Sequence, residues 1–224
     1  MKDLKKILLE GAVKLRVDLD EAAVDRLSVY KDFLKEYNKK VNLTSIVEDE
    51  EIIVKHFLDS LTVLTEIDIT EGANMIDVGT GAGFPGLVLK IAREKLNLVL
   101  VDSTMKKVRF LEETVKRLGL EDGSVRCIHA RAEELFRQQP ELSGGFDYAI
   151  SRAVARLPRL VEYCLPYVKS GGEFVAMKGR NYGEELEESR EIVKKLGGKI
   201  SNVKEITLPN SDIVHSIIKI KKIL

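Results

Sequence analysis

The chain of 224 residues contains no tryptophan, few prolines and cysteines, and no net charge. Its two cysteines, Cys127 in a strand-like run and Cys164 in a helical one, are too few for the disulfide framework of a secreted domain, and we interpret them as inert core residues. No run is apolar and long enough to span a bilayer, and the first residues lack the apolar core of a secretory signal. We therefore expect a cytoplasmic protein without membrane contacts.

Histidine is equally scarce, and its placement gives no sign of a metal centre. His56, His129 and His215 are far apart in the sequence. They show none of the spacings typical of zinc ligands. The sequence therefore predicts no metal site.

The absence of net charge argues at first against a nucleic-acid partner. The charges are unevenly distributed, however, because residues 1–72 are net acidic and residues 73–224 are net basic. The densest basic excess lies in residues 151–180, whose basic side chains are Arg152, Arg156, Arg159, Lys169, Lys178 and Arg180. Such a cluster is usually a set of solvated surface charges, but it can also bind a polyanion.

Apolar spacing predicts helices in the first 66 residues and alternating strands and helices afterwards. One early stripe recurs at steps of three and four, behind capping oxygens offered by Asp18 and Asp20; it consists of Ala23, Leu27, Tyr30, Leu34, Tyr37 and Val41. The expected strands are 73–78, 98–102, 125–130, 146–151 and 173–178, and the expected helices are 86–95, 104–118, 131–138, 157–169 and 184–196. Such alternation is typical of a parallel sheet covered on both faces.

The most informative segment is a glycine-rich turn that follows the first strand and opens a helical pattern. Gly79, Gly81 and Gly83 would let the backbone approach a ligand closely, and the helix start supplies free N–H groups. The strict dinucleotide-binding pattern would require glycine at position 84, where Phe84 lies. Asp102 ends the next strand about 20 residues later, the spacing at which a carboxylate can bind ribose hydroxyls. These features favour S-adenosylmethionine over NAD as the ligand.

The end of the chain points to the same class of protein. Two strand-like runs, 200–208 and 213–221, are joined by residues 209–212 and predict an antiparallel hairpin. A seven-stranded sheet that closes with such a hairpin is the layout of class I S-adenosylmethionine-dependent methyltransferases, whereas a plain dinucleotide fold would end with parallel strands. We therefore expect a Rossmann-like α/β domain over residues 67–224, preceded by a helical cap over residues 1–66.

Several candidate site residues follow the predicted strands at their carboxyl ends, where ligands bind in open α/β sheets. Asp102 either binds the ribose or caps the next helix, a task that Ser103 or Thr104 can also perform. Glu133 lies where an adenine ring would pack, or it is a helix-start charge favoured by the dipole. Arg152 is either a surface residue or the partner of a carboxylate tail on the cofactor.

Two further residues also allow a structural and a functional interpretation. Phe84 belongs either to the core or to the cofactor site, and Lys178 either contacts a phosphate or lies on a plain surface. The fourth strand ends with Ile-Ser-Arg-Ala at residues 150–153 instead of Asn-Pro-Pro-Tyr or Asp-Pro-Pro-Tyr, which disfavours methylation of an exocyclic adenine amine. No cysteine lies where attack on a pyrimidine ring would need one.

Short motifs along the whole chain carry a more specific resemblance. They are Tyr37-Asn38, Asn42-Leu43-Thr44-Ser45, His56-Phe57-Leu58-Asp59-Ser60, Asp77 to Gly86, Val101-Asp102-Ser103, Lys107-Val108-Arg109-Phe110-Leu111, Arg131-Ala132-Glu133-Glu134, Ser151-Arg152-Ala153 and Lys178-Gly179. With these motifs the chain resembles, from end to end, the bacterial 16S rRNA (guanine-N7) methyltransferase family, also called glucose-inhibited division protein B.

The resemblance implies S-adenosylmethionine as methyl donor and, as acceptor, a guanine in a decoding-region loop of 16S rRNA within the small ribosomal subunit. By motif match, it implies cofactor contacts at Gly79, Phe84, Ala132, Glu133 and Arg152. We add Gly81, Gly83 and Asp102 to this predicted cofactor site, and Arg152 and Lys178 are the predicted catalytic residues. We expect a monomer.

The predicted chemistry follows from guanine itself. N7 carries an in-plane lone pair, so no proton has to leave, and catalysis reduces to holding N7 in line with the methyl group at about 3–3.5 Å. Because N7 faces the methyl group, Arg152 cannot bind O6 and N7 together and must bind the cofactor carboxylate, O6 alone or a phosphate. Two alternatives stay open: a methyltransferase of this fold that acts on protein or a small molecule, and a non-catalytic RNA-binding assembly factor.

Overall fold

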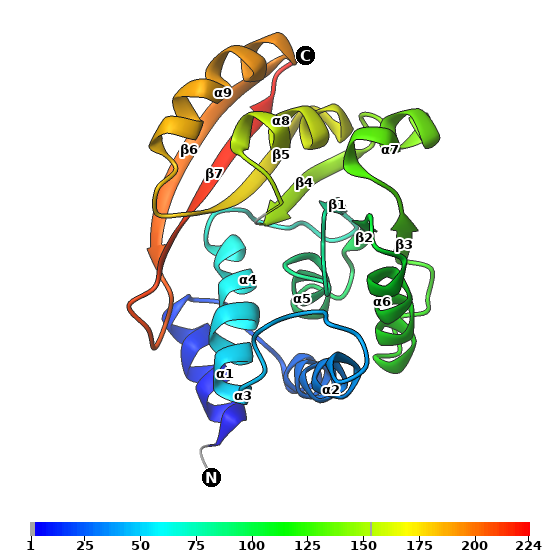
Figure 1. Cartoon of the computed structure of the whole chain (residues 1–224). Coiled ribbons are helices and arrows are strands. Elements are labelled where there is room, and N and C mark those ends of the chain that lie inside the picture. Colours follow the sequence, from blue (N-terminus) through cyan, green and yellow to red (C-terminus); the bar gives the residue numbers. More distant parts are fainter. Residues whose placement is uncertain (1–2, 153) are drawn as a thin grey trace.

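The computed structural model describes residues 3–152 and 154–224 and contains one seven-stranded sheet in the order β3-β2-β1-β4-β5-β7-β6 (Figure 1). The strands are β1 (Asn74–Val78), β2 (Asn97–Asp102), β3 (Val125–His129), β4 (Phe146–Arg152), β5 (Val168–Gly179), β6 (Gly198–Thr207) and β7 (Val214–Lys222). The longer helices are α1 (Leu4–Lys14), α2 (Glu21–Asn38), α5 (Gly86–Ala92), α6 (Met105–Arg117), α7 (Ala132–Gln138), α8 (Leu157–Cys164) and α9 (Gly183–Lys195).

The strand directions confirm the predicted fold class. Strands β1 to β5 run parallel, whereas β7 pairs antiparallel with both β5 and β6. The order reverses between β1 and β4, so the carboxyl ends of these two strands open a crevice at the switch point. The glycine turn, defined here as residues 79–83, follows β1 at this edge.

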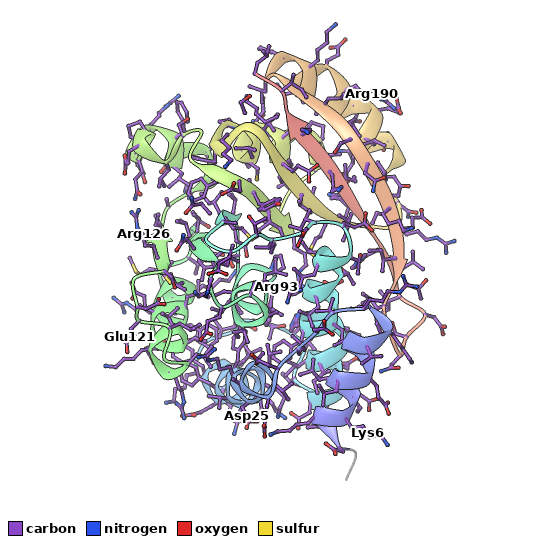
Figure 2. All side chains as sticks on the ribbon, turned by 180° about the vertical axis from the view of Figure 1, so that it is seen from behind. Lys6, Asp25, Arg93, Glu121, Arg126 and Arg190 are labelled. Atoms are coloured by element: carbon purple, nitrogen blue, oxygen red, sulfur yellow. The ribbon has the colours of Figure 1, made fainter. Side chains whose placement is uncertain are left out.

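Two hydrophobic cores cover the two faces of the sheet. Helices α7, α8 and α9 lie on one face, and α5 and α6 lie on the other (Figure 1). Helix α2 packs on the outside of α5 and α6, and α1 packs on α2. Buried residues of the N-terminal segment, such as Leu27 and Phe57, share one core with Leu87 and Leu100 from the sheet domain. Figure 2 shows side chains filling the space between these layers. The predicted cap and the sheet domain are therefore joined by a common core.

The cap is built from α1, α2 and an irregular helical stretch. Asp20 caps α2 by accepting a hydrogen bond from the backbone N–H of Ala23 at 2.7 Å, as one of the two predicted capping oxygens. Val41 was expected on the same stripe but lies beyond the end of α2. The irregular stretch consists of α3 (Asp49–Ile52), a π-helical segment η1 (Ile53–Leu58), α4 (Asp59–Leu61) and a 3₁₀ turn η2 (Thr62–Thr65).

Tyr30 joins this cap to the glycine turn. Its side chain is fully buried, and its hydroxyl donates a hydrogen bond to the backbone oxygen of Ala82. Its ring stacks on Phe57 and Phe84 at centroid distances of 5.6 and 5.4 Å. Helix α2 therefore sits directly behind the ligand edge of the sheet.

Some predicted element boundaries are wrong: the expected helix 86–95 ends at Ala92, and the largest error lies between α8 and β5, where the expected strand 173–178 begins at Val168. The expected helix 157–169 ends at Cys164, and the chain enters β5 at Val168 after a 3₁₀ turn that contains Pro166. Proline cannot donate the backbone hydrogen bond that would continue the helix. Gly172 lies in β5 beside a register shift, where an added Cβ would come within 2.6 Å of the Asp147 backbone oxygen.

The described helices, those in residues 3–152 and 154–224, all fall short of the length and apolarity that crossing a bilayer requires.

Candidate active site

The glycine turn is held in shape by Asp77, the last acidic residue of β1. Its Oδ2 accepts hydrogen bonds from Thr80 Oγ1 at 2.7 Å and from the backbone N–H of Gly86 at 2.8 Å. Gly79, with a φ of 75°, and Gly81, with a φ of 65°, adopt left-handed conformations that favour glycine. Complete burial raises the pKa of Asp77 to about 6, although the bonds from Thr80 and Gly86 act in the opposite direction.

Asp102 is the second carboxylate that orders this turn. Its Oδ2 accepts from the backbone N–H of Gly81 at 2.9 Å, and its Oδ1 accepts from the backbone N–H of Thr104 at 2.8 Å. Of the two residues named as able to cap α6, Ser103 and Thr104, Thr104 occupies the N-cap position, and its side chain makes no capping hydrogen bond. Each Asp102 oxygen keeps further acceptor capacity, and the residue lines the pocket described next.

A pocket of about 420 Å³ opens at the carboxyl edge of β1, β2 and β4. This volume lies in the range of small-molecule sites. The predicted residues that line it are Gly79, Gly81, Phe84, Asp102, Ala132, Glu133 and Arg152. The structure therefore brings together most of the predicted cofactor site around one cavity.

Gly83 and Lys178 are not among the residues that line this pocket. Gly83 lies behind the turn, and an added Cβ there would come within 2.5 Å of the hydroxyl of Tyr30. Lys178 points to α9, where its Nζ lies 2.8 Å from Glu185 Oε2 and 3.0 Å from the backbone oxygen of Ala155. The cofactor contact predicted for Gly83 and the catalytic role predicted for Lys178 stay predictions. Their positions outside the pocket lining do not favour direct contact with a ligand in this pocket.

Arg152 lines the pocket together with Thr44 and His56 from the cap. Arg152 Nη1 donates to Asp59 Oδ2 at 2.6 Å and to the backbone oxygen of Lys55 at 3.2 Å. Its Nη2 lies 3.3 Å from His56 Nδ1, and its guanidinium carbon lies 5.3 Å from the centre of the Phe84 ring. We call the set Thr44, His56, Asp59, Arg152 and His215 the cap wall: Thr44, His56 and Arg152 line the pocket, and Asp59 and His215 support Arg152 without lining it. Ala153, the last residue of the predicted Ser-Arg-Ala segment, lies outside the described residues.

Asp59 connects this arginine to the terminal hairpin. Its Oδ1 accepts a hydrogen bond from Nδ1 of His215 in β7. Thr62 Oγ1 donates to the Asp59 backbone oxygen at 2.6 Å and lies 3.1 Å from His215 Nε2. Burial alone would raise the pKa of Asp59, but the bond from His215 and the charge of Arg152 outweigh it and hold this pKa below its usual value.

His56 occupies the middle of the cap wall. Its ring stacks on Phe84 with a centroid distance of 4.3 Å and an interplanar angle of 14°. Because a guanidinium only donates hydrogen bonds, Nδ1 accepts from Arg152 and Nε2 carries the proton that faces Thr44 Oγ1 at 3.1 Å. Burial, together with the charge of Arg152, lowers the pKa of His56 to about 4. The ring is therefore neutral at pH 7.

The loop that carries Thr44 is fixed by one side chain of α2. Asn38 Oδ1 accepts from the backbone N–H groups of Leu43 and Thr44 at 2.7 and 3.0 Å, and Asn38 Nδ2 donates to the Thr44 oxygen at 2.9 Å. The two cap motifs that contain Asn38 and Thr44 thus serve one local structure. This local structure holds the Thr44 hydroxyl in place beside His56.

Sequence reasoning quoted these cap motifs but gave His56, Asp59 and His215 no role. A usable signal was present, because His56 and Asp59 are three residues apart and therefore share one face of a helix. His215 carried no such local signal, since it is 156 residues from Asp59. Nothing in its surrounding sequence indicates this partner.

The basic cluster of residues 151–180 is largely neutralised in space. Its ion pairs are Arg152 with Asp59, Arg156 with Glu184 and Glu188, Arg159 with Glu162, Lys169 with Asp147, and Lys178 with Glu185. Lys169 and Asp147 also lie near the amino ends of their strands, away from the pocket. Arg180 is exposed just after β5 and is the member of the cluster best placed to meet a polyanion.

The described residues include no group of three or more histidine, cysteine or acidic side chains arranged to hold a metal ion. The two cysteines are also poor nucleophiles. Burial raises the pKa of Cys127 to about 12, and that of Cys164, which is fully buried, lies well above its usual value.

Solved structures show the same fold at low sequence identity. TYW2 of M. jannaschii in complex with AdoMet matches with a TM-score of 0.59 at 15% identity and covers 80% of each chain. A SAM dependent methyltransferase from Aquifex aeolicus matches with a TM-score of 0.56 at 20% identity, over 83% of this chain and 97% of the other. These matches confirm the predicted class I methyltransferase fold.

Sequence comparison identifies the family. The model of the family described as "GidB: rRNA small subunit methyltransferase G" matches residues 23–214. Ribosomal RNA small subunit methyltransferase G of Alkaliphilus metalliredigens is 50% identical over 98% of this chain and 90% of its own length. The protein of the same name from Acetivibrio thermocellus is 49% identical over 98% and 88%. The predicted resemblance, an enzyme that uses S-adenosylmethionine, is thus confirmed, and the chain belongs to the family of ribosomal RNA small subunit methyltransferases G.

Proposed function

We propose that this enzyme methylates N7 of a guanine in the decoding region of 16S rRNA. The observation that carries the proposal is the chemical character of the cap wall. Its titratable side chains are already engaged: His56 is neutral with both ring nitrogens hydrogen-bonded, and Asp59 is ion-paired with Arg152 and hydrogen-bonded to His215. A wall of this kind suits an acceptor whose lone pair is available without deprotonation, as at guanine N7.

The residues around the pocket fit S-adenosylmethionine. That cofactor supplies an electrophilic methyl group on a sulfonium centre when bound. We assign it to Gly79, Gly81, Phe84, Asp102, Ala132, Glu133 and Arg152, with Gly83 supporting the turn. Gly81 supports this assignment because an added Cβ would meet no protein atom within 4 Å and would project into free space. The remaining acceptor capacity of Asp102 suits a pair of ribose hydroxyls.

Arg152 has two donors left for a ligand. Nη1 uses its two protons on Asp59 and Lys55, and Nη2 uses one on His56. The remaining Nε–H and one Nη2–H are neighbouring donors, the arrangement that binds a carboxylate in a bidentate way. We therefore favour the carboxylate of the cofactor, rather than guanine O6 or a phosphate, as the partner of Arg152.

The charge distribution favours the assembled small subunit as substrate. Most of the basic cluster is ion-paired, and the chain has no net charge, so its electrostatic attraction for bare RNA is weak. We propose that a monomer recognises the subunit in the cytoplasm, where shape and protein contacts add to the RNA contacts.

The proposal is tested by methyl transfer to purified small subunits from a strain that lacks the gene. We expect a single labelled guanine that is sensitive to borohydride reduction and aniline cleavage, the signature of N7 methylation, together with the corresponding mass shift in a decoding-region fragment. Label in protein or in a small molecule would support the first alternative function. Transfer to a base amine, or to another part of the rRNA, would contradict the proposal.

A further inference from the structure

We propose that Lys178 and Glu185 form a clamp that positions the loop of residues 154–157, the connection that carries Val154 into the pocket. The inference rests on the proposed function, and it gives Lys178 a positioning role instead of contact with phosphate. The loop matters because Val154 is 41% exposed, lines the pocket and covers Gly79, where an added Cβ would come within 2.3 Å of its Cγ2.

The clamp holds this loop through its backbone. Lys178 Nζ donates to the Ala155 oxygen at 3.0 Å, and Glu185 Oε2 accepts from the Leu157 N–H at 2.7 Å. The two side chains meet at 2.8 Å and are only 12% and 16% exposed. One ion pair thus fixes a carbonyl and an amide on the two sides of Arg156.

The electrostatics of Glu185 support a permanent pair. Burial alone would raise its pKa, but the hydrogen bonds from Lys178 and from the Leu157 N–H outweigh burial and lower it. Arg156 adds a third tie, because its guanidinium pairs with Glu184 and Glu188 of the same helix. The loop is therefore anchored to α9 and β5 at successive residues, while Arg152 is anchored to the cap on the other side.

The two possible roles of Lys178 predict opposite effects of a change at Glu185. If Lys178 contacts phosphate, Glu185 competes for it, and Glu185→Gln should strengthen RNA binding. If the pair is a clamp, Glu185→Gln releases the loop and slows methyl transfer without changing RNA affinity. Removal of either partner should then have the same effect, so the double variant should lose little more than each single variant.

The experiment measures kcat, RNA affinity and its salt dependence for Lys178→Met, Glu185→Gln, their combination and Lys178→Arg, with small subunits as substrate. Glu187→Gln is the matched control, because this residue lies on the same helix in an exposed pair with Arg190 (Figure 2). We expect kcat to fall about tenfold in both single variants and in the double variant, with partial recovery in Lys178→Arg, since a loosened loop misplaces reacting groups. The salt slope should stay unchanged.

A second measurement is independent of methyl transfer. Hydrogen exchange of the Leu157 amide should be faster in Glu185→Gln than in the wild type and in Glu187→Gln. If the wild type fails to methylate small subunits, the proposed function fails, and this exchange measurement still tests the clamp. Tighter RNA binding by Glu185→Gln, a salt slope lowered by about one in Lys178→Met, or unchanged kcat in both single variants would overturn the clamp.

Discussion

The two sides of the pocket are built in different ways. On the side of the glycine turn, Asp77 and Asp102 bind backbone N–H groups of nearby residues, and the longest of these bonds in sequence links Asp102 to Gly81, 21 residues apart. On the cap wall, side chains bind one another across 93 residues between Arg152 and Asp59 and 156 residues between His215 and Asp59. The first side depends on local chain geometry, and the second depends on the whole tertiary structure.

This difference has a consequence for tolerance to mutation. A backbone-built turn is altered mainly by residues that change its conformation or remove its two carboxylates. A side-chain network in a buried setting leaves charges without partners when one member is removed. Arg152 and Asp59, with side chains 18% and 11% exposed, are the members for which this cost is largest.

The largest expected effect is that of Arg152→Met. The change removes the donor that we assign to the cofactor carboxylate and leaves Asp59 without its arginine partner. We therefore expect kcat/KM to fall on the order of a hundredfold, which corresponds to an activation free energy higher by about 3 kcal/mol. Steady-state methyl transfer to small subunits measures the loss. Arg159→Met, which removes an exposed arginine paired with Glu162, should retain wild-type activity. Equal activity of the two variants would show that the cap wall has no role in the reaction.

The two sides should also respond oppositely to acid. The folded-state pKa of His56, about 4, lies below its ordinary value of 6.5, so the folded protein binds fewer protons and stability falls as pH falls from 6.5 towards 4. The folded-state pKa of Asp77, about 6, lies above 3.8, so this group adds stability as pH falls from 6 towards 3.8. Each contribution is about 3 kcal/mol.

Denaturant unfolding between pH 4 and 7 separates these contributions. Because the two groups oppose each other in the wild type, His56→Phe should become relatively more stable as the pH falls, and Asp77→Asn should become relatively less stable. The phenylalanine keeps a ring against Phe84. Parallel pH profiles for the wild type and both variants would contradict the assignment of either group.

A smaller effect is expected for cofactor affinity when Asp102 is changed. Asp102→Ala should weaken binding of S-adenosylmethionine by about 2 kcal/mol, because charge-assisted hydrogen bonds to the ribose are lost. Titration calorimetry measures this effect. Asp102→Asn separates charge from shape, since the amide oxygen can still accept one of the two backbone bonds. Wild-type affinity in Asp102→Ala would remove Asp102 from the cofactor site.

The smallest effect is expected at Arg180, which belongs neither to the glycine turn nor to the cap wall. Arg180→Gln should lower the salt slope of RNA binding by about one and leave cofactor affinity unchanged. Binding measured over a series of salt concentrations tests this role. A drop in cofactor affinity at constant salt slope would place Arg180 in the cofactor site instead.

Local features of the molecule could be predicted from the sequence, whereas contacts between distant side chains could not. Local sequence patterns predicted the strands, the glycine turn, the position of Asp102 and the terminal hairpin. Neighbouring residues determine the backbone conformation at Gly79 and the alternation of strands and helices, so these features can be predicted locally. Family motifs also indicated several of the residues that line the pocket. The predicted helix extended to residue 169 because the apolar pattern continues past Pro166. The helix ends at Cys164 instead, because Pro166 lacks the N–H that would continue the helical hydrogen bonds.

The partners of the charged residues could not be predicted from the sequence. His215 meets Asp59 because β7 is inserted beside β5, and Lys178 meets Glu185 because α9, which packs on α8 and β6, follows directly after β5. Such pairings depend on how distant elements pack. Counting charges in residues 151–180 indicated a basic surface, whereas the folded chain supplies an acid for most of them from another element.

The central claim is that the methyl group goes to a lone pair that needs no base, in front of a wall whose titratable groups are already engaged. The most direct test is the pH dependence of the single-turnover rate, with small subunits and S-adenosylmethionine both saturating, since product release can mask the chemical step in steady state. We predict a nearly constant rate from neutral to mildly alkaline pH. A steep rise with pH that disappears in a variant of His56 or Glu133 would show that a base is used, and would contradict transfer to guanine N7.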